Sequence, residues 1–130
     1  MVMYPGDVVV VKHSRAGVRG VVHYVCIDFH FGLYLLALND PPFHNSFVHI
    51  GAGQENWLTT DLYIHTNILQ QLSLPPSGIH LGMLSKYSKS MIVRCAEAEK
   101  ALLLEEKRII MERLTGEPDV FYHDVDEDLD

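Results

Sequence analysis

The sequence predicts a mainly β domain that is followed by a long helix and an acidic tail. Short runs of β-branched and aromatic residues, separated by turn residues, fill residues 1–84. From residue 85 to residue 115 the apolar side chains recur every three or four positions, which is the period of an α-helix. Residues 116–130 are rich in carboxylates. We therefore expect a β body, a C-terminal helix and a tail with boundaries at these positions.

The strands of the body are expected at residues 8–11, 18–26, 33–38, 47–50 and 57–65. Turn residues rich in Asn, Pro and Gly follow the third and the fourth. One helical turn is expected at residues 68–72, before Pro75 and Pro76 interrupt it. About five short strands with tight turns are typical of a strongly bent sheet or a small barrel.

The turn between the first two strands carries a candidate anion site. If residues 14–17 form the turn, Lys12 faces Arg19 across the hairpin. Two facing cations repel unless an anion lies between them. Lys12, Arg15 and Arg19 are therefore candidate phosphate- or RNA-binding residues. His13, at the end of the same turn, is the best placed histidine to transfer protons there.

One continuous helix is expected over residues 88–114, because its apolar stripe consists of Met91, Cys95, Ala98, Leu102 and Ile109. At 1.5 Å per residue it would be about 40 Å long, which exceeds the width of a small barrel. The helix should therefore either pack along its own body or contact a second subunit, and we expect a homodimer.

The negative charge is concentrated in the C-terminal third. Residues 1–95 carry six Lys/Arg and five Asp/Glu, whereas residues 96–130 carry four and twelve. An acidic chain binds nucleic acid poorly without sequence specificity. The tail also contains apolar side chains, a combination typical of docking peptides, and its candidate partner-binding residues are Val120, Phe121, Tyr122, Asp124 and Asp126. The alternative is a solvated C-terminus that keeps the protein in solution.

Several classes of function find no support in the sequence. No apolar run approaches bilayer length, no secretion signal begins the chain, and only two cysteines occur, so we expect a cytoplasmic protein with reduced Cys26 and Cys95 and no membrane partner. The eight histidines lack zinc-site spacing, and no nucleotide-binding or serine-hydrolase motif occurs. We expect neither a metal nor a cofactor. His23 and His49 lie in expected strands, where half-buried, hydrogen-bonded imidazoles are the simplest interpretation.

Residues 6–11 (GDVVVV) and 17–22 (GVRGVV) resemble the opening of the PemK/MazF-type toxins. Residues 47–50 and 58–64 resemble later strands of that family, and residues 81–85 (LGMLS) resemble the start of its last helix. Parts of these later segments are also similar to the related CcdB toxins. The resemblance covers about residues 6–100 in short pieces. It implies a dimeric SH3-like barrel.

In PemK/MazF members the resemblance implies metal-independent cleavage of single-stranded RNA through attack of a 2′-hydroxyl. Arg19 matches the family's catalytic arginine, and His13 and Thr59 complete the candidate catalytic set. Two departures weaken the transfer. Gly20 replaces the usual proline, and Asn39 and Asp40 stand where the family's catalytic Thr or Ser falls.

Three functions remain open on these grounds. The leading one is a small toxin-like or inhibitory module that binds a protein partner through its barrel, helix or acidic tail. The second is an endoribonuclease in which Arg19 stabilises the transition state. The third is an SH3-like module that binds nucleic acid without catalysis.

Overall fold

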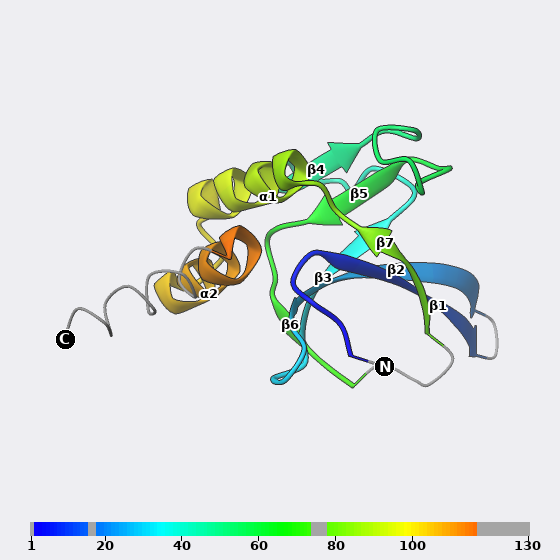
Figure 1. The fold of residues 1–130 in the computed structure, drawn as a ribbon, viewed down its shortest axis with the longest axis horizontal. Coiled ribbons are helices and arrows are strands. Elements are labelled where there is room, and N and C mark those ends of the chain that lie inside the picture. The colour runs from blue at the N-terminus through cyan, green and yellow to red at the C-terminus, as the bar shows by residue number, and fades with distance from the viewer. Residues whose placement is uncertain (1, 16–17, 74–77, 117–130) are drawn as a thin grey trace.

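The computed structural model describes residues 2–15, 18–73 and 78–116, with the backbone alone for residues 13–15 and 18–20. Within these residues the strands are β1 (Asp7–Arg15), β2 (Val18–Asp28), β3 (Leu33–Leu38), β4 (Phe47–Ile50), β5 (Leu62–His65), β6 (Gln70–Gln71) and β7 (Ile79–Met83). Two helices follow, α1 (Lys86–Ala98) and α2 (Leu104–Thr115). The mainly β class with C-terminal helices is thus confirmed (Figure 1).

The strands form one open antiparallel sheet in the order β4-β5-β3-β2-β1-β7, and β6 pairs with β3. The predicted closed barrel is wrong, because closure would require β4 to pair with β7 and these two strands are the opposite edges of the sheet. The chain between β4 and β5 lies at β7 instead. The ring of Trp57 from that loop packs against Gly82 of β7 so closely that a Cβ there would lie 2.4 Å from it.

The β1–β2 hairpin differs from its predicted register. Lys12 pairs with Val21, and Arg19 pairs with Ser14, so the expected Lys12–Arg19 pair does not form. The paired positions continue to Arg15 and Val18, which leaves a connection two residues shorter than the four-residue turn expected. The register is thus shifted by two residues, which changes every cross-strand partner but keeps each side chain on its expected face of the sheet.

The middle of the chain contains three further differences. The fifth strand spans only four residues, because residues 57–61 belong to the loop that packs on β7. The helical turn expected at residues 68–72 is wrong: β6 lies there and pairs with Leu33 and Tyr34. The last strand, β7, was not expected at all. It pairs with β1 across a register shift between Val8 and Val9.

The predicted single long helix is also wrong, because the chain turns between α1 and α2. Glu99 ends α1, and its carboxylate accepts hydrogen bonds from Ser46 Oγ and from the Ala101 backbone N–H. Leu102 then enters the core, with 6% of its surface exposed. Burying Leu102 between two shorter helices lets both pack on the sheet, which one rod about 40 Å long could not do.

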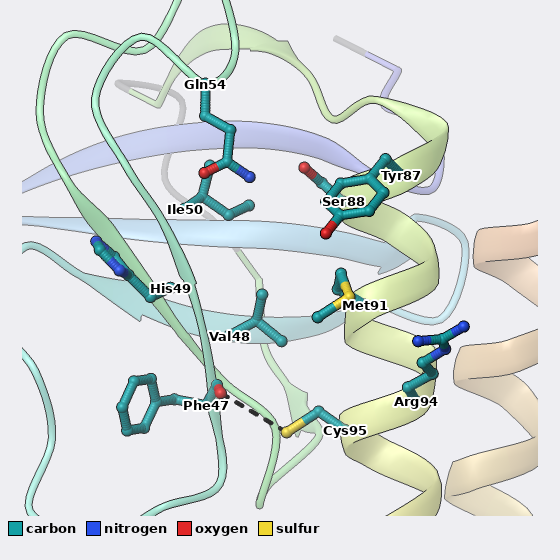
Figure 2. A pocket seen from close by; sticks show the side chains of 10 residues that line it. All are labelled: Phe47, Val48, His49, Ile50, Gln54, Tyr87, Ser88, Met91, Arg94 and Cys95. Carbon is teal, nitrogen blue, oxygen red and sulfur yellow. Dashed lines mark hydrogen bonds between the residues drawn. The ribbon is translucent and has the colours of Figure 1, made fainter.

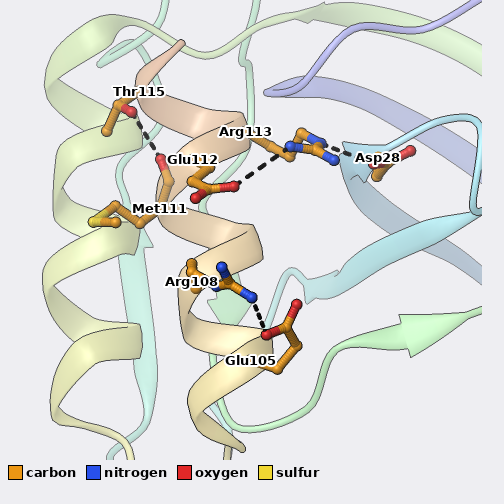
Figure 3. Close-up of polar contacts among 7 residues, drawn as sticks. All are labelled: Asp28, Glu105, Arg108, Met111, Glu112, Arg113 and Thr115. Carbon is orange, nitrogen blue, oxygen red and sulfur yellow. Dashed lines mark hydrogen bonds and ion pairs between the residues drawn. The ribbon is translucent and has the colours of Figure 1, made fainter. Parts of the chain in front are cut away.

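The second helix is fixed to the sheet by an ion pair. Arg113 Nε donates to Asp28 Oδ2 at 2.8 Å, which joins α2 to the end of β2 (Figure 3). Burial alone would raise the pKa of Asp28, but the hydrogen bonds from Arg113 and from the Phe31 backbone outweigh it and hold the pKa below its usual value. The helices therefore pack on their own body, which was one of the two predicted alternatives.

The sheet is apolar on both faces. The larger core lies between the sheet and the helices and includes Ile27, Leu35, Ile64, Ile92 and Ile110, each with none of its surface exposed. A smaller cluster on the other face contains Met3, Val9, Cys26 and Tyr34. No described helix is long and apolar enough to cross a membrane.

Candidate functional site

The candidate anion site has no described binding geometry. Lys12 is exposed, and for His13, Arg15 and Arg19 only the backbone is described. Thr59 is exposed in the loop before β5. The structure therefore supplies no contact that brings Arg19, His13 and Thr59 together.

Asn39, which stands where the resemblance would place a catalytic Thr or Ser, has a structural role. Asn39 Nδ2 donates to Thr60 Oγ1 at 3.1 Å and to the Asp61 carbonyl at 2.9 Å. These bonds hold the end of β3 to the start of β5. The Asn39 side-chain amide thus donates its hydrogen bonds to neighbouring loop residues within the described chain.

The predicted partner-binding residues of the tail, Val120, Phe121, Tyr122, Asp124 and Asp126, lie outside the described residues.

In the described part of the chain, the side chains that could bind a metal ion or act as reactive thiols are those of His, Asp, Glu and Cys. No group of three or more His, Cys, Asp or Glu within the described part of the chain is arranged to hold a metal ion. Burial raises the pKa of Cys26 to about 12, with Asp7 and Asp28 adding to the effect, so this thiol stays protonated at neutral pH. Both cysteines are free.

His23 does not match the half-buried, hydrogen-bonded state expected of it, whereas His49 comes closer, since its Nε2 lies 3.8 Å from Asp61 Oδ2. His23 is 6% exposed, and its Nδ1 atom has no hydrogen-bond partner among the described residues. Burial lowers its pKa, so the neutral form is favoured. His49 instead has a side chain that is 46% exposed and stacks on Tyr63, with ring centroids 4.5 Å apart.

A hollow formed by both a strand and a helix lies between β4 and α1 (Figure 2). It encloses about 490 Å³. All four residues of β4 line it, together with Gln54 from the next loop and one stripe of α1 formed by Tyr87, Ser88, Met91, Arg94 and Cys95. We refer to this hollow as the β4 groove.

The β4 strand is an edge of the sheet, and its outer backbone groups open to the groove. The Thr66 N–H donates to the Ser46 carbonyl at 2.9 Å, which makes Ser46 and Thr66 a hydrogen-bonded pair of the antiparallel ladder. Hydrogen-bonded pairs alternate along such a ladder, so Val48 and Ile50 also bond to β5. The N–H and C=O groups of Phe47 and His49 consequently point outward, away from β5.

Only one weak contact covers these outward groups within the described chain. Cys95 Sγ donates to the Phe47 carbonyl at 3.7 Å, as the dashed line in Figure 2 shows. The Phe47 and His49 side chains point away from α1 in Figure 2, whereas Val48 and Ile50 point toward it. The side of β4 next to α1 is thus formed by backbone donors and acceptors with apolar side chains beneath them.

The N-terminus of α1, which forms the helical wall of the groove, is fixed by hydrogen bonds. Ser85 caps α1, since its side chain accepts a hydrogen bond from the Ser88 N–H. Glu55, which is 7% exposed, accepts from the Ser85 N–H, from Ser85 Oγ at 2.9 Å and from Ser88 Oγ at 2.6 Å. A buried carboxylate at a helix N-terminus is stabilised by these donors and by the helix dipole.

A histidine pair lies beside the other end of β4. His44 and His65 face each other with 3.4 Å between Nε2 and Nδ1, and His44 Nδ1 accepts from the Ser46 N–H. His44 must therefore carry its proton on Nε2 and donate it to His65. Burial lowers the pKa of His65, and the neighbouring His44 lowers it further. The neutral form of His65 is thus favoured.

Compared with protein-family models, curated proteins and solved structures, the chain matches none of them. The resemblance to PemK/MazF-type toxins therefore stays a prediction. The β4 groove is a candidate site on the basis of its geometry alone.

Sequence reasoning did not anticipate the groove. One signal was present, because Met91 and Cys95 belong to the predicted apolar stripe, with Tyr87 and Arg94 beside them at the helical period. That stripe was wrongly expected to be the main buried face of the helix, since the buried residues of α1 are Ser88, Ile92, Val93 and Ala96. The other half of the groove had no signal. Residues 47–50 were correctly expected as a strand, but a strand's sequence does not tell whether it lies at the edge of a sheet.

Proposed function

We propose that the protein is a binding module that takes an extended segment of a protein partner along the β4 edge. The outward backbone groups of Phe47 and His49, which open into the β4 groove, carry this proposal. Addition of a peptide strand to an exposed sheet edge is a recurrent mode of peptide recognition, in which backbone hydrogen bonds give affinity and side-chain pockets give specificity.

The chemistry of the groove suits such a ligand. A peptide strand would bond to the two N–H groups and to the His49 carbonyl, each bond contributing about 0.5–1.5 kcal/mol net. Its alternate side chains would face α1, where Met91 and the 65% exposed Tyr87 offer apolar and aromatic surface. The short strand limits the backbone contribution, so the side chains must supply much of the affinity.

Proline and alanine at position 49 test the proposal. The full chain is used to select ligands from a displayed library of random peptides, and the selected peptides are titrated against two variants. His49→Pro removes an outward N–H without breaking a bond to β5, because proline is tolerated at the free side of an edge strand. His49→Ala removes the same ring and keeps the N–H.

We expect His49→Pro to weaken peptide binding by about tenfold or more, which corresponds to about 1.4 kcal/mol. His49→Ala should bind like the original chain. Amide exchange of Val48 checks that β4 still pairs with β5 in both variants. Failure to select any peptide, or equal binding by the two variants, would refute the proposal.

A competing outcome is RNA cleavage, as predicted from Arg19. Single-stranded RNA is incubated with the full chain and a chelator, beside the Arg19→Ala variant. Cleavage by the original chain and not by Arg19→Ala would replace the binding module with an endoribonuclease. Intact RNA in both reactions favours the module.

A further inference from the structure

The β4 groove carries an unneutralised positive charge. Among its lining residues there is no Asp or Glu, and Arg94 is the one that is charged at every ordinary pH. Arg94 is exposed and has no hydrogen bond or ion pair to any described residue. Arg113, by contrast, pairs with Asp28. A guanidinium left open beside a groove favours a ligand that brings a carboxylate.

The chain's own last residues have that chemistry. Residues 117–130 contain seven carboxylates and no Lys or Arg, whereas residues 1–116 contain ten Lys/Arg and ten Asp/Glu. All of the net charge of −7 therefore belongs to the last segment, and the remainder is neutral. Within the segment, Val120, Phe121, Tyr122 and Val125 are residues that favour extended strands. The carboxylates of this segment complement the charge of Arg94, and its strand-forming residues suit pairing with the free edge of β4.

Geometry favours a second copy as the source of this segment. Gly116 ends α2, and the four residue steps from Gly116 to Val120 reach only about 14 Å. In Figure 2, α1 lies between the groove and α2. A helix with its side chains is about 10–12 Å across, so a path around half of α1 is about 16–19 Å long and exceeds that reach. A separate copy of the chain has no such restriction.

We infer that the β4 groove of one copy binds the C-terminal segment, residues 117–130, of a second copy as an added strand. The inference rests on the proposed function and names its ligand. The outward groups of Phe47 and His49 bond to the backbone of the segment around residues 120–125, and Arg94 pairs with one of its carboxylates. When both copies do this, the assembly closes as a symmetric dimer.

Complementation between two full-length variants tests this inference. His49→Pro disables the groove and leaves the segment, whereas Tyr122→Pro disables the strand character of the segment and leaves the groove. His49→Ala and Tyr122→Phe are the matched controls. Sedimentation equilibrium measures the association of each variant alone and of an equimolar mixture.

We expect the original chain and both controls to form a dimer. Each proline variant alone should associate at least tenfold more weakly, and their mixture should recover association through its one intact groove–segment pair. In the original chain, the amide hydrogens of Phe47 and His49 should exchange at least tenfold more slowly than in Tyr122→Pro. Arg94→Gln should also weaken association. Added salt should weaken the association of Arg94→Gln less than that of the original chain.

Three results would overturn the inference in different ways. The chain could stay monomeric while library peptides bind to the original chain and fail to bind to His49→Pro. In that case the groove binds peptides, but the C-terminal segment is not its ligand. If a dimer forms and persists unchanged in His49→Pro, another surface joins the copies. If neither library peptides nor the segment bind, the proposed function fails as well.

Discussion

The two edges of the sheet, β4 and β7, differ in how their backbone is covered. At β7 the Trp57 indole N–H donates to the Met83 carbonyl at 3.1 Å, and its ring lies on Gly82. The register shift next to Val8 also makes this edge irregular. At β4 the outward groups of His49 have no partner among the described residues. Proteins usually protect free edges against pairing with other chains, and this difference between the two edges is the basis of the proposal that β4 binds an added strand.

The largest expected effect comes from uncovering the β7 edge. Trp57→Ala removes a large, partly buried ring from the core and exposes the strand beneath it. We expect the free energy of unfolding to fall by about 2–4 kcal/mol, because the surroundings of a deleted aromatic side chain collapse only partly. Urea denaturation measures the change.

Trp57→Phe is the matched control for this prediction. It keeps a ring on Gly82 and loses the hydrogen bond to Met83, so we expect a loss of about 1 kcal/mol. Equal losses in Trp57→Ala and Trp57→Phe would mean that the ring does not protect this edge. Aggregation that rises in Trp57→Ala but not in Trp57→Phe would show that the Trp57 ring protects the β7 edge, in contrast to the open β4 edge.

The next effect concerns the wall of the β4 groove. Glu55→Ala leaves the Ser85 and Ser88 hydroxyls without their buried acceptor and should lower the free energy of unfolding by about 1–3 kcal/mol. It should also weaken peptide binding, because the first turn of α1 carries Tyr87. Chemical denaturation and peptide titration measure the two losses.

Glu97→Ala, an exposed position of the same helix, is the control for Glu55→Ala and should change stability by less than about 0.5 kcal/mol. A Glu55→Ala protein as stable as Glu97→Ala would show that the buried carboxylate does not hold the wall.

The smallest effect is a dependence on pH at the end of β4. Since the pKa of His65 in the folded protein lies below its usual value of 6.5, the unfolded chain takes up a proton first as the pH falls. The stability provided by neutral His65 is therefore complete above about pH 6.5 and decreases below it. His23 acts in the same direction, because burial lowers its pKa too.

We expect His65→Asn to lose less stability than the original chain between about pH 7.5 and about pH 5.5. The asparagine amide can still accept a hydrogen bond from His44 but cannot be protonated in this range. Denaturation at both pH values measures the difference. An unchanged pH dependence in His65→Asn would assign it to His23, whose pKa is also lowered by burial.

Local sequence patterns predicted the strands well where packing did not interfere. Leu33–Leu38 and Phe47–Ile50 have the expected bounds, and α1 begins at Lys86, next to the expected start. The errors lie where a distant contact decides. Trp57 belongs to a loop because its ring packs on β7, and the long helix breaks because Leu102 enters the core. No periodicity within a short window contains that information.

The sequence by itself determined the mainly β class, the helical C-terminal third and the concentration of negative charge after residue 116. These features depend on side-chain type and local period. Only the tertiary structure decided which strands became edges, that the sheet stayed open, and that the stripe from Tyr87 to Cys95 faces the free side of β4. Such features arise from contacts between residues far apart in the chain, because burying apolar surface depends on which elements meet and not on the order in which they occur.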